Sequence, residues 1–370
     1  MRTFALPLKI GVNALYLKPG AVGGTEIYLR SLLSAMAVID SENSWTIFAN
    51  SETPPDLMPS APNFVWAPQP IGATFRPGRI LYEQLVLPRR AAKVDILFNP
   101  GFTAPFFGTA NVTVFHDLQH KRHPEYFRWF DLPFWDLLLW GSAKRSRRVI
   151  TVSQSTHDDL ARYYRLKSDI ISHGVDPQYF AIGESRRPEK LLLCVSTLHP
   201  HKNHVRLIRA FAKFQQRYAD YHLVLAGIRG FAVKEIEAEI VAHNLTTAVR
   251  ITGWIPQAEL FDLYARAAGM VYPSTFEGFG MPVIEAMAAQ VPLACSNIEP
   301  LHSLVDGCAI EFDPLSEDAI TRALYGLIES PLSIAPALAR ARQFSWEQAA
   351  HQTLAVIQSA ATDRPRSSHM

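Results

Sequence analysis

The segment E-G-F-G-M-P-V-I-E at residues 277–285 decides the fold class of this chain. An apolar run over 268–272 precedes it, and the pattern of residues 281–290 is typical of a helix. This order predicts a strand, a glycine loop and a helix start, where backbone N–H groups and the helix dipole bind an anion such as phosphate. The flanking Glu277 and Glu285 indicate that the ligand also carries sugar hydroxyls, because carboxylates accept hydrogen bonds from hydroxyl pairs.

Each glutamate alone also has a structural interpretation. Glu285 fits a first-turn acid favoured by the helix dipole, and Glu277 fits a loop acid that faces water. The combined pattern favours a ligand site, since Gly278 and Gly280 stand where the backbone must approach a bound molecule.

Length and composition indicate a soluble protein of two domains. The chain has 370 residues, of which 48% are hydrophobic and 19% are charged. It contains no run of 18 or more apolar residues, so we expect no membrane-spanning helix, and its N-terminus lacks the pattern of a signal peptide. Three cysteines favour a reducing cytoplasm over a disulfide framework. No Cys or His cluster has zinc spacing, so we expect neither a metal nor a cofactor.

The net charge of +2 is unevenly distributed. Residues 1–183 hold 19 Lys and Arg against 15 Asp and Glu, a net of +4, whereas residues 184–370 hold 17 against 19, a net of −2. The basic excess gathers at 144–148 and 89–93. Such clusters attract anionic lipids or acidic acceptors, and solvated helix ends are the structural alternative.

Apolar runs of strand length alternate with helical patterns in two series. The predicted strands of the first series are Lys9–Ala14, Trp45–Ala49, Asp95–Asn99, Asn111–Phe115 and Arg148–Val152. Those of the second are Leu191–Ser196, Tyr221–Ala226, Val249–Thr252, Gly269–Tyr272 and Pro292–Cys295. The helices predicted between them include Glu26–Ile39, Asn203–Arg217, Ala232–His243 and Ala258–Ala267. Continuously apolar strands predict parallel sheets buried on both faces, and therefore an α/β fold of two doubly wound, Rossmann-like domains.

A polar stretch without periodicity, at 183–190, predicts the domain boundary. We expect residues 1–185 to form the N-terminal domain and residues 186–344 the C-terminal domain. A last helical pattern follows at 345–360, and residues 361–370 are predicted to be a disordered tail.

Glycines also follow the first predicted strand, in the loop from Gly20 to Thr25. Gly23 and Gly24 would let the backbone approach a ligand closely. The loop lacks the G-x-G-x-x-G fingerprint of dinucleotide binding, and a flexible connection is an equally good interpretation.

His116 and Asp117 stand at the end of a predicted strand, where ligands of open α/β sheets bind. A histidine there can donate a hydrogen bond to a sugar hydroxyl or a phosphate. A packed or solvent-facing histidine and a capping aspartate are the structural alternatives.

The first strand of the second series leads into S-T-L-H-P-H-K-N at 196–203 and then into a helix. Lys202 lies at the start of that helix, where a cation is unfavourable unless an anion neutralises it. It therefore indicates a phosphate site, with His201 and the hydroxyl of Thr197 as further candidate contacts.

An aromatic stretch over 127–140 precedes the basic cluster. It fits an interfacial membrane helix, and it also fits a helix packed on the core, which is the commoner case. Both interpretations hold if only part of the stripe faces lipid.

Together these motifs resemble the retaining glycosyltransferases of GT-B fold, family 4. The resemblance covers nearly the whole chain and rests on Gly23-Gly24, F-H-D at 115–117, I-T-V-S at 150–153, H-G-V-D-P at 173–177, Thr197 to Asn203, the two glutamates of 277–285 and F-S-W-E at 344–347. It implies two Rossmann-like domains that face a cleft, with the C-terminal helix crossing back onto the first domain.

The resemblance also implies residue roles. Glu285 would hold the ribose hydroxyls of a nucleotide sugar, and Glu277 would contact hydroxyls of the transferred sugar. Lys202 would neutralise the diphosphate and His116 would lie near the donor sugar, so the expected catalytic residues are His116, Lys202 and Glu277. The expected donor-binding residues are Gly23, Gly24, Thr197, His201, Lys202, Phe279, Gly280, Met281 and Glu285.

Thr197 departs from many relatives, which carry an arginine five residues before the lysine. Part of the diphosphate clamp is then missing, or is supplied by His201 or Arg206. Many bacterial mannosyltransferases share the threonine, which favours GDP-mannose as the donor.

The expected reaction is transfer of a sugar, preferably mannose, from a nucleotide-diphosphate donor to a saccharide or lipid-linked saccharide in polysaccharide biosynthesis. We expect it in the cytoplasm, with a peripheral contact to the inner face of an anionic membrane left open, and no nucleic acid partner. The sequence has no D-x-D pair for a metal, so Lys202 and a helix start are expected to stabilise the leaving diphosphate. A nucleotide-sugar epimerase or sugar phosphorylase on the same fold, and a non-catalytic sugar-nucleotide-binding protein, are the alternatives.

Overall fold

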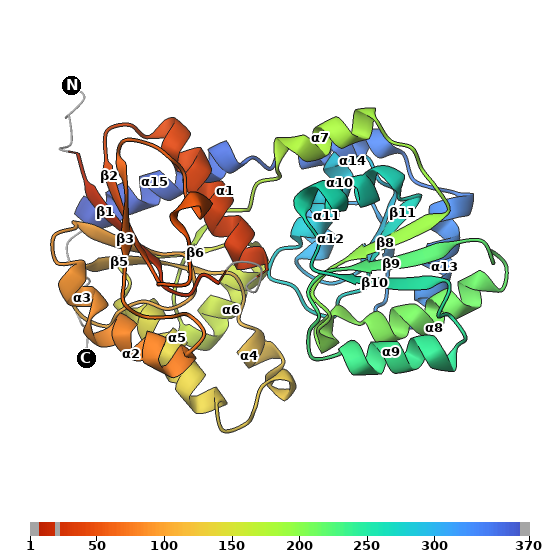
Figure 1. The fold of residues 1–370 in the computed structure, drawn as a ribbon, viewed down its shortest axis with the longest axis horizontal. Helices are drawn as coiled ribbons and strands as arrows, with labels where there is room; N and C mark the ends of the chain where they lie inside the picture. Colours follow the sequence, from red (N-terminus) through yellow and green to blue (C-terminus); the bar gives the residue numbers. More distant parts are fainter. Residues whose placement is uncertain (1–6, 19–22, 363–370) are drawn as a thin grey trace. The chain divides into compact units, whose positions relative to one another are not determined.

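The computed structural model describes residues 7–18 and 23–362, which form two compact units (Figure 1). The first unit comprises the chain up to Gly174 together with the helix that begins at Trp346, and the second runs from Val175 to Ser345. The division between the units therefore lies earlier in the chain than the expected boundary between residues 185 and 186. The reason is helix α7 (Pro177–Glu184), which belongs to the second unit because Tyr179 packs against the rings of Phe261 and Tyr264, at 4.9 and 5.1 Å.

The first unit is built on a seven-stranded parallel sheet with the order β3-β2-β1-β4-β5-β6-β7. Its strands are β1 (Lys9–Ala14), β2 (Ser44–Ala49), β3 (Phe64–Pro68), β4 (Ile96–Asn99), β5 (Ala110–Phe115), β6 (Arg148–Thr151) and β7 (Asp169–Ile170). The strand order reverses between β1 and β4. Open α/β sheets bind ligands beyond the carboxyl ends of the strands at such a reversal.

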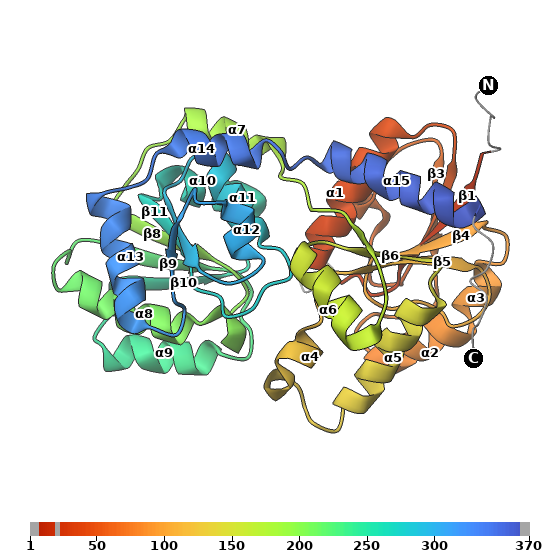
Figure 2. The same ribbon diagram turned by 180° about the vertical axis from the view of Figure 1, so that it is seen from behind.

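Helices lie on both faces of this sheet (Figures 1 and 2). They are α1 (Gly24–Ile39), α2 (Arg76–Leu85), α3 (Leu87–Arg90), α4 (Gln119–Arg122), α5 (Leu132–Arg145), α6 (Gln154–Tyr164) and α15 (Trp346–Thr362). The last helix packs along α1, and the ring of Trp346 lies 5.9 Å from that of Tyr28. Of the expected tail, residues 361 and 362 end α15, and residues 363–370 lie outside the described part of the chain.

The second unit is built on a six-stranded parallel sheet with the order β10-β9-β8-β11-β12-β13. Its strands are β8 (Leu191–Val195), β9 (His222–Ala226), β10 (Val249–Gly253), β11 (Gly269–Tyr272), β12 (Leu293–Ser296) and β13 (Ile310–Phe312). Its other helices are α8 (His204–Gln215), α9 (Val233–Ala242), α10 (Gln257–Arg266), α11 (Met281–Ala288), α12 (Leu301–Val305), α13 (Glu317–Glu329) and α14 (Ile334–Ala341). The two-domain α/β fold expected from the sequence is confirmed.

The aromatic stretch at 127–140 divides between core and surface. Leu138 and Leu139 are buried on the inner side of α5, whereas a second set is exposed, namely Trp129, Phe130, Phe134, Leu137 and Trp140. The interpretation as a helix packed on the core therefore holds for the inner side of α5, and the membrane interpretation stays a prediction. Over the residues that the structure describes, no helix is long and apolar enough to cross a membrane.

Candidate functional site

The predicted loops of the second unit meet at the strand reversal of its sheet. Strands β8 and β11 are neighbours there, and the order reverses between them. Lys202 follows β8 and Glu277 follows β11. Because both strands are parallel, both loops emerge at the same edge of the sheet, where this fold class binds ligands.

Lys202 and Glu277 form a direct ion pair. Lys202 Nζ lies 2.6 Å from Glu277 Oε1, and their side chains are 14% and 9% exposed. Lys202 Nζ also lies 3.3 Å from the hydroxyl of Tyr272, the last residue of β11. The anion that this lysine requires is therefore the carboxylate of Glu277, a pairing that the sequence analysis did not predict.

Asn203 fixes the loop that carries Lys202. It adopts a left-handed conformation, with φ of 60°, and caps the start of α8. Its Nδ2 donates to the carbonyl oxygens of Pro273 and Pro314, at 3.0 and 2.8 Å. Arg206, proposed as a substitute in the diphosphate clamp, donates from Nη1 to Asn203 Oδ1 at 2.8 Å. The arginine thus orients the residue that positions Lys202.

Thr197 and His201 lie in the same loop, half-buried. The carbonyl oxygen of His201 accepts a hydrogen bond from the backbone N–H of Thr275 at 2.8 Å, which joins the loops after β8 and β11. A Cβ at Gly227 would lie 2.1 Å from the carbonyl oxygen of Ser196, so only glycine fits against this loop. Gly227 is a residue that the sequence analysis missed.

Gly280 sets the start of α11. Its φ is 111°, and a Cβ there would lie 2.5 Å from Leu301 Cδ2. Phe279 and Met281, on either side, are buried. Helix α11 thus begins directly after the glycine loop that carries Glu277. The positive end of its dipole lies at this loop, as the sequence pattern predicted.

We expect Gly280→Ala to lower the free energy of unfolding by about 1–3 kcal/mol, because the new methyl group meets both an unfavourable φ and a side chain. Urea unfolding monitored by circular dichroism measures the change. Gly307→Ala is the matched control, since Gly307 also has a positive φ, of 76°, but nothing lies within 4 Å of the added Cβ. Equal losses in both variants would contradict the role given to the Leu301 contact.

Glu285 is held separately from the ion pair, by two tyrosines. The hydroxyl of Tyr264 donates to Glu285 Oε2 at 3.0 Å, and the hydroxyl of Tyr179 also hydrogen-bonds the carboxyl group. Burial raises the pKa of Glu285 to about 7, against the opposing effect of these hydrogen bonds. The residue lies beyond the first turn of α11, which contains no acid, so the first-turn interpretation does not hold.

The remaining predicted site residues lie in the first unit. Gly23, with φ of 56°, immediately precedes α1, and Gly24 is the first residue of that helix. Residues 20–22 of the predicted glycine loop lie outside the described residues.

His116 is buried at the end of β5. Its Nε2 lies 2.8 Å from the carbonyl oxygen of Pro100, and its ring packs edge-on against Tyr28 at 4.7 Å. Burial lowers the pKa of His116 to about 4, so the ring is neutral at pH 7. Asp117 Oδ1 accepts a hydrogen bond from the N–H of Gln119 at 2.9 Å, an Asx turn directly before α4, whose N-cap is Leu118.

The structure thus brings Lys202 and Glu277 into contact, whereas Glu285 is held separately by the hydroxyls of Tyr179 and Tyr264. Tyr179, Tyr264 and Tyr272 escaped the sequence analysis; of these, Tyr272 was identifiable as the last residue of a predicted strand. Within residues 7–18 and 23–362, no group of three or more His, Cys, Asp or Glu side chains is arranged to hold a metal ion.

Two family models match the chain, one on each unit. Residues 175–343 match the model of glycosyl transferases group 1, and residues 22–179 match that of glycosyltransferase family 4. O-antigen chain mannosyltransferase B of Escherichia coli is 29% identical over 299 residues, which cover 73% of this chain and 77% of the relative. O-antigen chain mannosyltransferase RfbU of Salmonella typhimurium is 30% identical over 236 residues, which cover 63% of this chain and 64% of the relative.

Solved structures share the fold at low sequence identity. A sucrose-phosphate synthase from Thermosynechococcus elongatus matches with a TM-score of 0.79 and 19% identity, covering 96% of this chain and 99% of that one. HepE of Anabaena, in complex with UDP and glucose, matches with a TM-score of 0.73 and 18% identity, covering 95% and 100%.

Proposed function

This chain belongs to the family 4, group 1 glycosyltransferases of GT-B fold, and we propose that it transfers mannose from GDP-mannose to a saccharide or lipid-linked saccharide, with retention of anomeric configuration. Transfer of a glycosyl group follows from the family. The choice of mannose is supported by the relatives named as O-antigen chain mannosyltransferases. The observation that carries the proposed mechanism is the buried pair of Lys202 and Glu277 at the strand reversal.

In the proposed mechanism, the donor diphosphate displaces Glu277 from Lys202. The ammonium group and the start of α11 then stabilise the charge that develops on the diphosphate as its bond to the anomeric carbon breaks. Glu277, once released, accepts hydrogen bonds from hydroxyls of the donor sugar. The acceptor hydroxyl attacks the anomeric carbon from the face that the diphosphate leaves, and its proton passes to a phosphate oxygen. We propose that the lysine and the helix start provide this stabilisation without a metal.

A thermal-shift screen of GDP-, UDP- and ADP-sugars tests the donor site, because a ligand that binds only the folded state raises its melting temperature. We expect GDP-mannose to give the largest shift, and mannose to appear in the product when an acceptor mixture is added. A larger shift with a UDP-sugar overturns the choice of GDP-mannose. No shift with any nucleotide sugar overturns the proposed site.

We expect the affinity for GDP-mannose to rise as the pH increases from 6 to 8. Glu285 has a pKa raised to about 7 by burial, and only its ionised form gives charge-assisted hydrogen bonds from the ribose hydroxyls. Binding near pH 6.5 should therefore release a proton, since the donor carries no group that titrates near neutrality. Calorimetry in buffers of different ionisation enthalpy measures that proton, and Glu285→Gln should abolish it. Binding without proton release in the native chain would contradict this role.

We further propose that the exposed aromatic surface of the first unit rests on an anionic membrane. We call this set, Trp129, Phe130, Phe134, Leu137 and Trp140, the α5 aromatic surface. Support comes from its exposure, with Trp129 at 81%, and from Arg128, Lys144 and Arg145 beside it in sequence. Aromatic rings at the interface and cations near anionic headgroups both favour such binding. The cytoplasmic location stays a prediction.

Sedimentation with vesicles tests this surface. We expect binding to phosphatidylglycerol vesicles and weak binding to phosphatidylcholine vesicles, with a loss of roughly tenfold in the Trp129→Ala/Phe130→Ala variant. Phe231→Ala is the control, because Phe231 is 87% exposed but belongs to the second unit. The proposal would be refuted if all three proteins sedimented equally with phosphatidylglycerol vesicles. It would also be refuted if the native chain sedimented equally with both kinds of vesicle.

A further inference from the structure

The first unit contains its own cavity, of about 530 Å³. It opens at the carboxyl ends of β1, β4 and β5, next to the strand reversal of that sheet. Aromatic rings form much of its wall, from Tyr16, Phe102, Phe127 and Trp135. A cavity of this size, with apolar walls and a few converging polar groups, is typical of a small-molecule site.

The charged groups that line the cavity are predominantly cationic. Lys18, Arg76 and Arg79 contribute three positive charges, and Asp117 contributes one negative charge. His120 also lines the cavity, and burial lowers its pKa to about 4, so it is neutral at pH 7. The lining therefore favours an anionic ligand.

Arg79 lines this cavity and carries a buried nitrogen without a hydrogen-bond partner among the described residues. The residue is 6% exposed, and its Nη1 has no hydrogen-bond partner among the described residues. The carboxylate oxygen paired with it, Glu83 Oε2, lies 3.9 Å away, which is an ion-pair distance and too long for a hydrogen bond. A buried guanidinium with an unsatisfied N–H is costly unless a ligand completes it.

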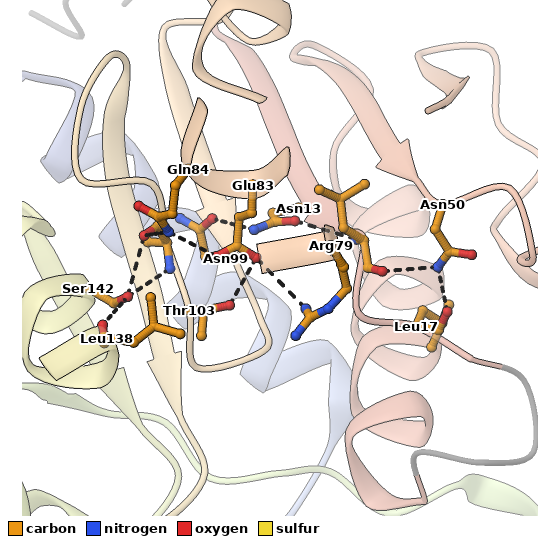
Figure 3. A network of polar contacts seen from close by, with 12 residues as sticks. Asn13, Leu17, Asn50, Arg79, Glu83, Gln84, Asn99, Thr103, Leu138 and Ser142 are labelled. Atoms are coloured by element: carbon orange, nitrogen blue, oxygen red, sulfur yellow. Dashed lines mark hydrogen bonds and ion pairs between the residues drawn. The ribbon is translucent and has the colours of Figure 1, made fainter. Parts of the chain in front are cut away.

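Glu83 is already satisfied by other donors (Figure 3). Thr103 Oγ1 donates to Glu83 Oε2 at 2.9 Å, and Gln84 Nε2 lies 3.3 Å from Oε1. The carboxylate thus balances the charge of Arg79 and leaves its Nη1 without a hydrogen-bond acceptor among the described residues.

Arg76 brings a second guanidinium to the rim. Its Cζ lies 3.6 Å from the ring centroid of Trp135, which orients the planar group over an aromatic face. Partial burial of its guanidinium, and then the neighbouring Arg79, lower the pKa of Arg76 to about 10, so the two cations oppose each other. An anion between them would remove that repulsion.

We propose that this cavity binds a phosphate group on the acceptor saccharide, with Arg79 and Arg76 as specificity-determining residues. The inference rests on the proposed glycosyl transfer and names the chemical class of its acceptor. The guanidinium fork of Arg79 meets two phosphate oxygens, Arg76 contributes from the rim, and the aromatic wall packs against the sugar ring. Phosphate suits the positive charge of the lining, where Lys18, Arg76 and Arg79 outnumber Asp117 and the carboxylate of Glu83 that pairs with Arg79 by one charge.

The test is a binding measurement with three probes. α-D-Mannose 1-phosphate, D-glucuronic acid and methyl α-D-mannoside are titrated by calorimetry into the full chain carrying Lys202→Met, which removes the proposed diphosphate contact of the second unit. We expect mannose 1-phosphate to bind most tightly, and Arg79→Met to weaken it roughly tenfold to a hundredfold. Arg76→Met should weaken it less, because this side chain is exposed at the rim. Arg89→Met, an exposed arginine of α3, is the control.

Each outcome decides the proposal. Equal affinity for the phosphate and neutral probes overturns it, and equal affinity for glucuronic acid overturns the choice of phosphate. If Arg79→Met fails to fold because Glu83 is left uncompensated, the double variant Arg79→Met/Glu83→Gln and the single variant Arg76→Met carry the test. Binding of the probes is measured without the donor. If mannose 1-phosphate does not bind, the melting-temperature shift expected with GDP-mannose is unaffected. If GDP-mannose does not bind, the titration with mannose 1-phosphate can still be interpreted.

Discussion

Replacing Lys202 by methionine should lower kcat/KM for glycosyl transfer by roughly 10²–10³-fold, the size of effect seen when one preorganised charge-stabilising donor is removed. In the structure the side chain of Lys202 is 14% exposed, and its ammonium group lies 2.6 Å from the carboxylate of Glu277. A cation so little hydrated interacts strongly with the charge that appears on a departing diphosphate. Initial rates with radiolabelled donor measure the loss, which should fall on kcat more than on KM.

The controls for Lys202 separate charge from fold. Lys202→Arg keeps the charge and should retain part of the activity, whereas Lys213→Met, on the exposed side of α8, should retain all of it. Because Lys202→Met leaves the buried Glu277 uncompensated, its melting temperature must be compared with that of Lys202→Met/Glu277→Gln. A folded Lys202→Met variant with full activity would eliminate the assigned mechanism.

The buried strands were predictable because helices cover both faces of each sheet. Strands such as β8 and β11 consist almost wholly of buried residues and appear in the sequence as unbroken apolar runs. The unpredicted strands β3, β7 and β13 all lie at sheet edges, and few of their residues are fully buried. β7 and β13 have only two and three residues, too few for a recognisable run. Position at an edge is not the whole reason, because β3 is apolar throughout and the edge strand β10 was predicted.

The site was only partly predictable, because its contacts join distant parts of the chain. The glycine loop at Gly280 and the cation at Lys202 are local signals that backbone conformation and the helix dipole explain. The ion pair between Lys202 and Glu277 spans 75 residues and depends on β8 and β11 being neighbours. The tyrosines around Glu285 come from α7 and α10, which no motif connects to α11. The roles of His116, Gly23 and Gly24 stay predictions.

Glu285→Ala should weaken GDP binding by about 3 kcal/mol, roughly a hundredfold, through loss of charge-assisted hydrogen bonds to the ribose hydroxyls. Calorimetry with GDP and with its 2′,3′-dideoxy analogue tests this contact directly. The native chain should prefer GDP strongly, and the variant should bind both nucleotides equally. Glu259→Ala, an exposed acid on α10, should leave the preference unchanged.

The two nucleotides and two proteins form a double-mutant cycle whose coupling energy isolates the interaction between Glu285 and the ribose hydroxyls. General destabilisation by the substitution cancels in this difference, because it affects both nucleotides alike. Tyr264→Phe offers an internal check, since it removes a hydrogen bond that helps keep the carboxyl group of Glu285 ionised. That variant should retain the preference for GDP but shift its onset to higher pH. A coupling energy near zero would place the ribose away from Glu285, whatever the affinity of the native chain.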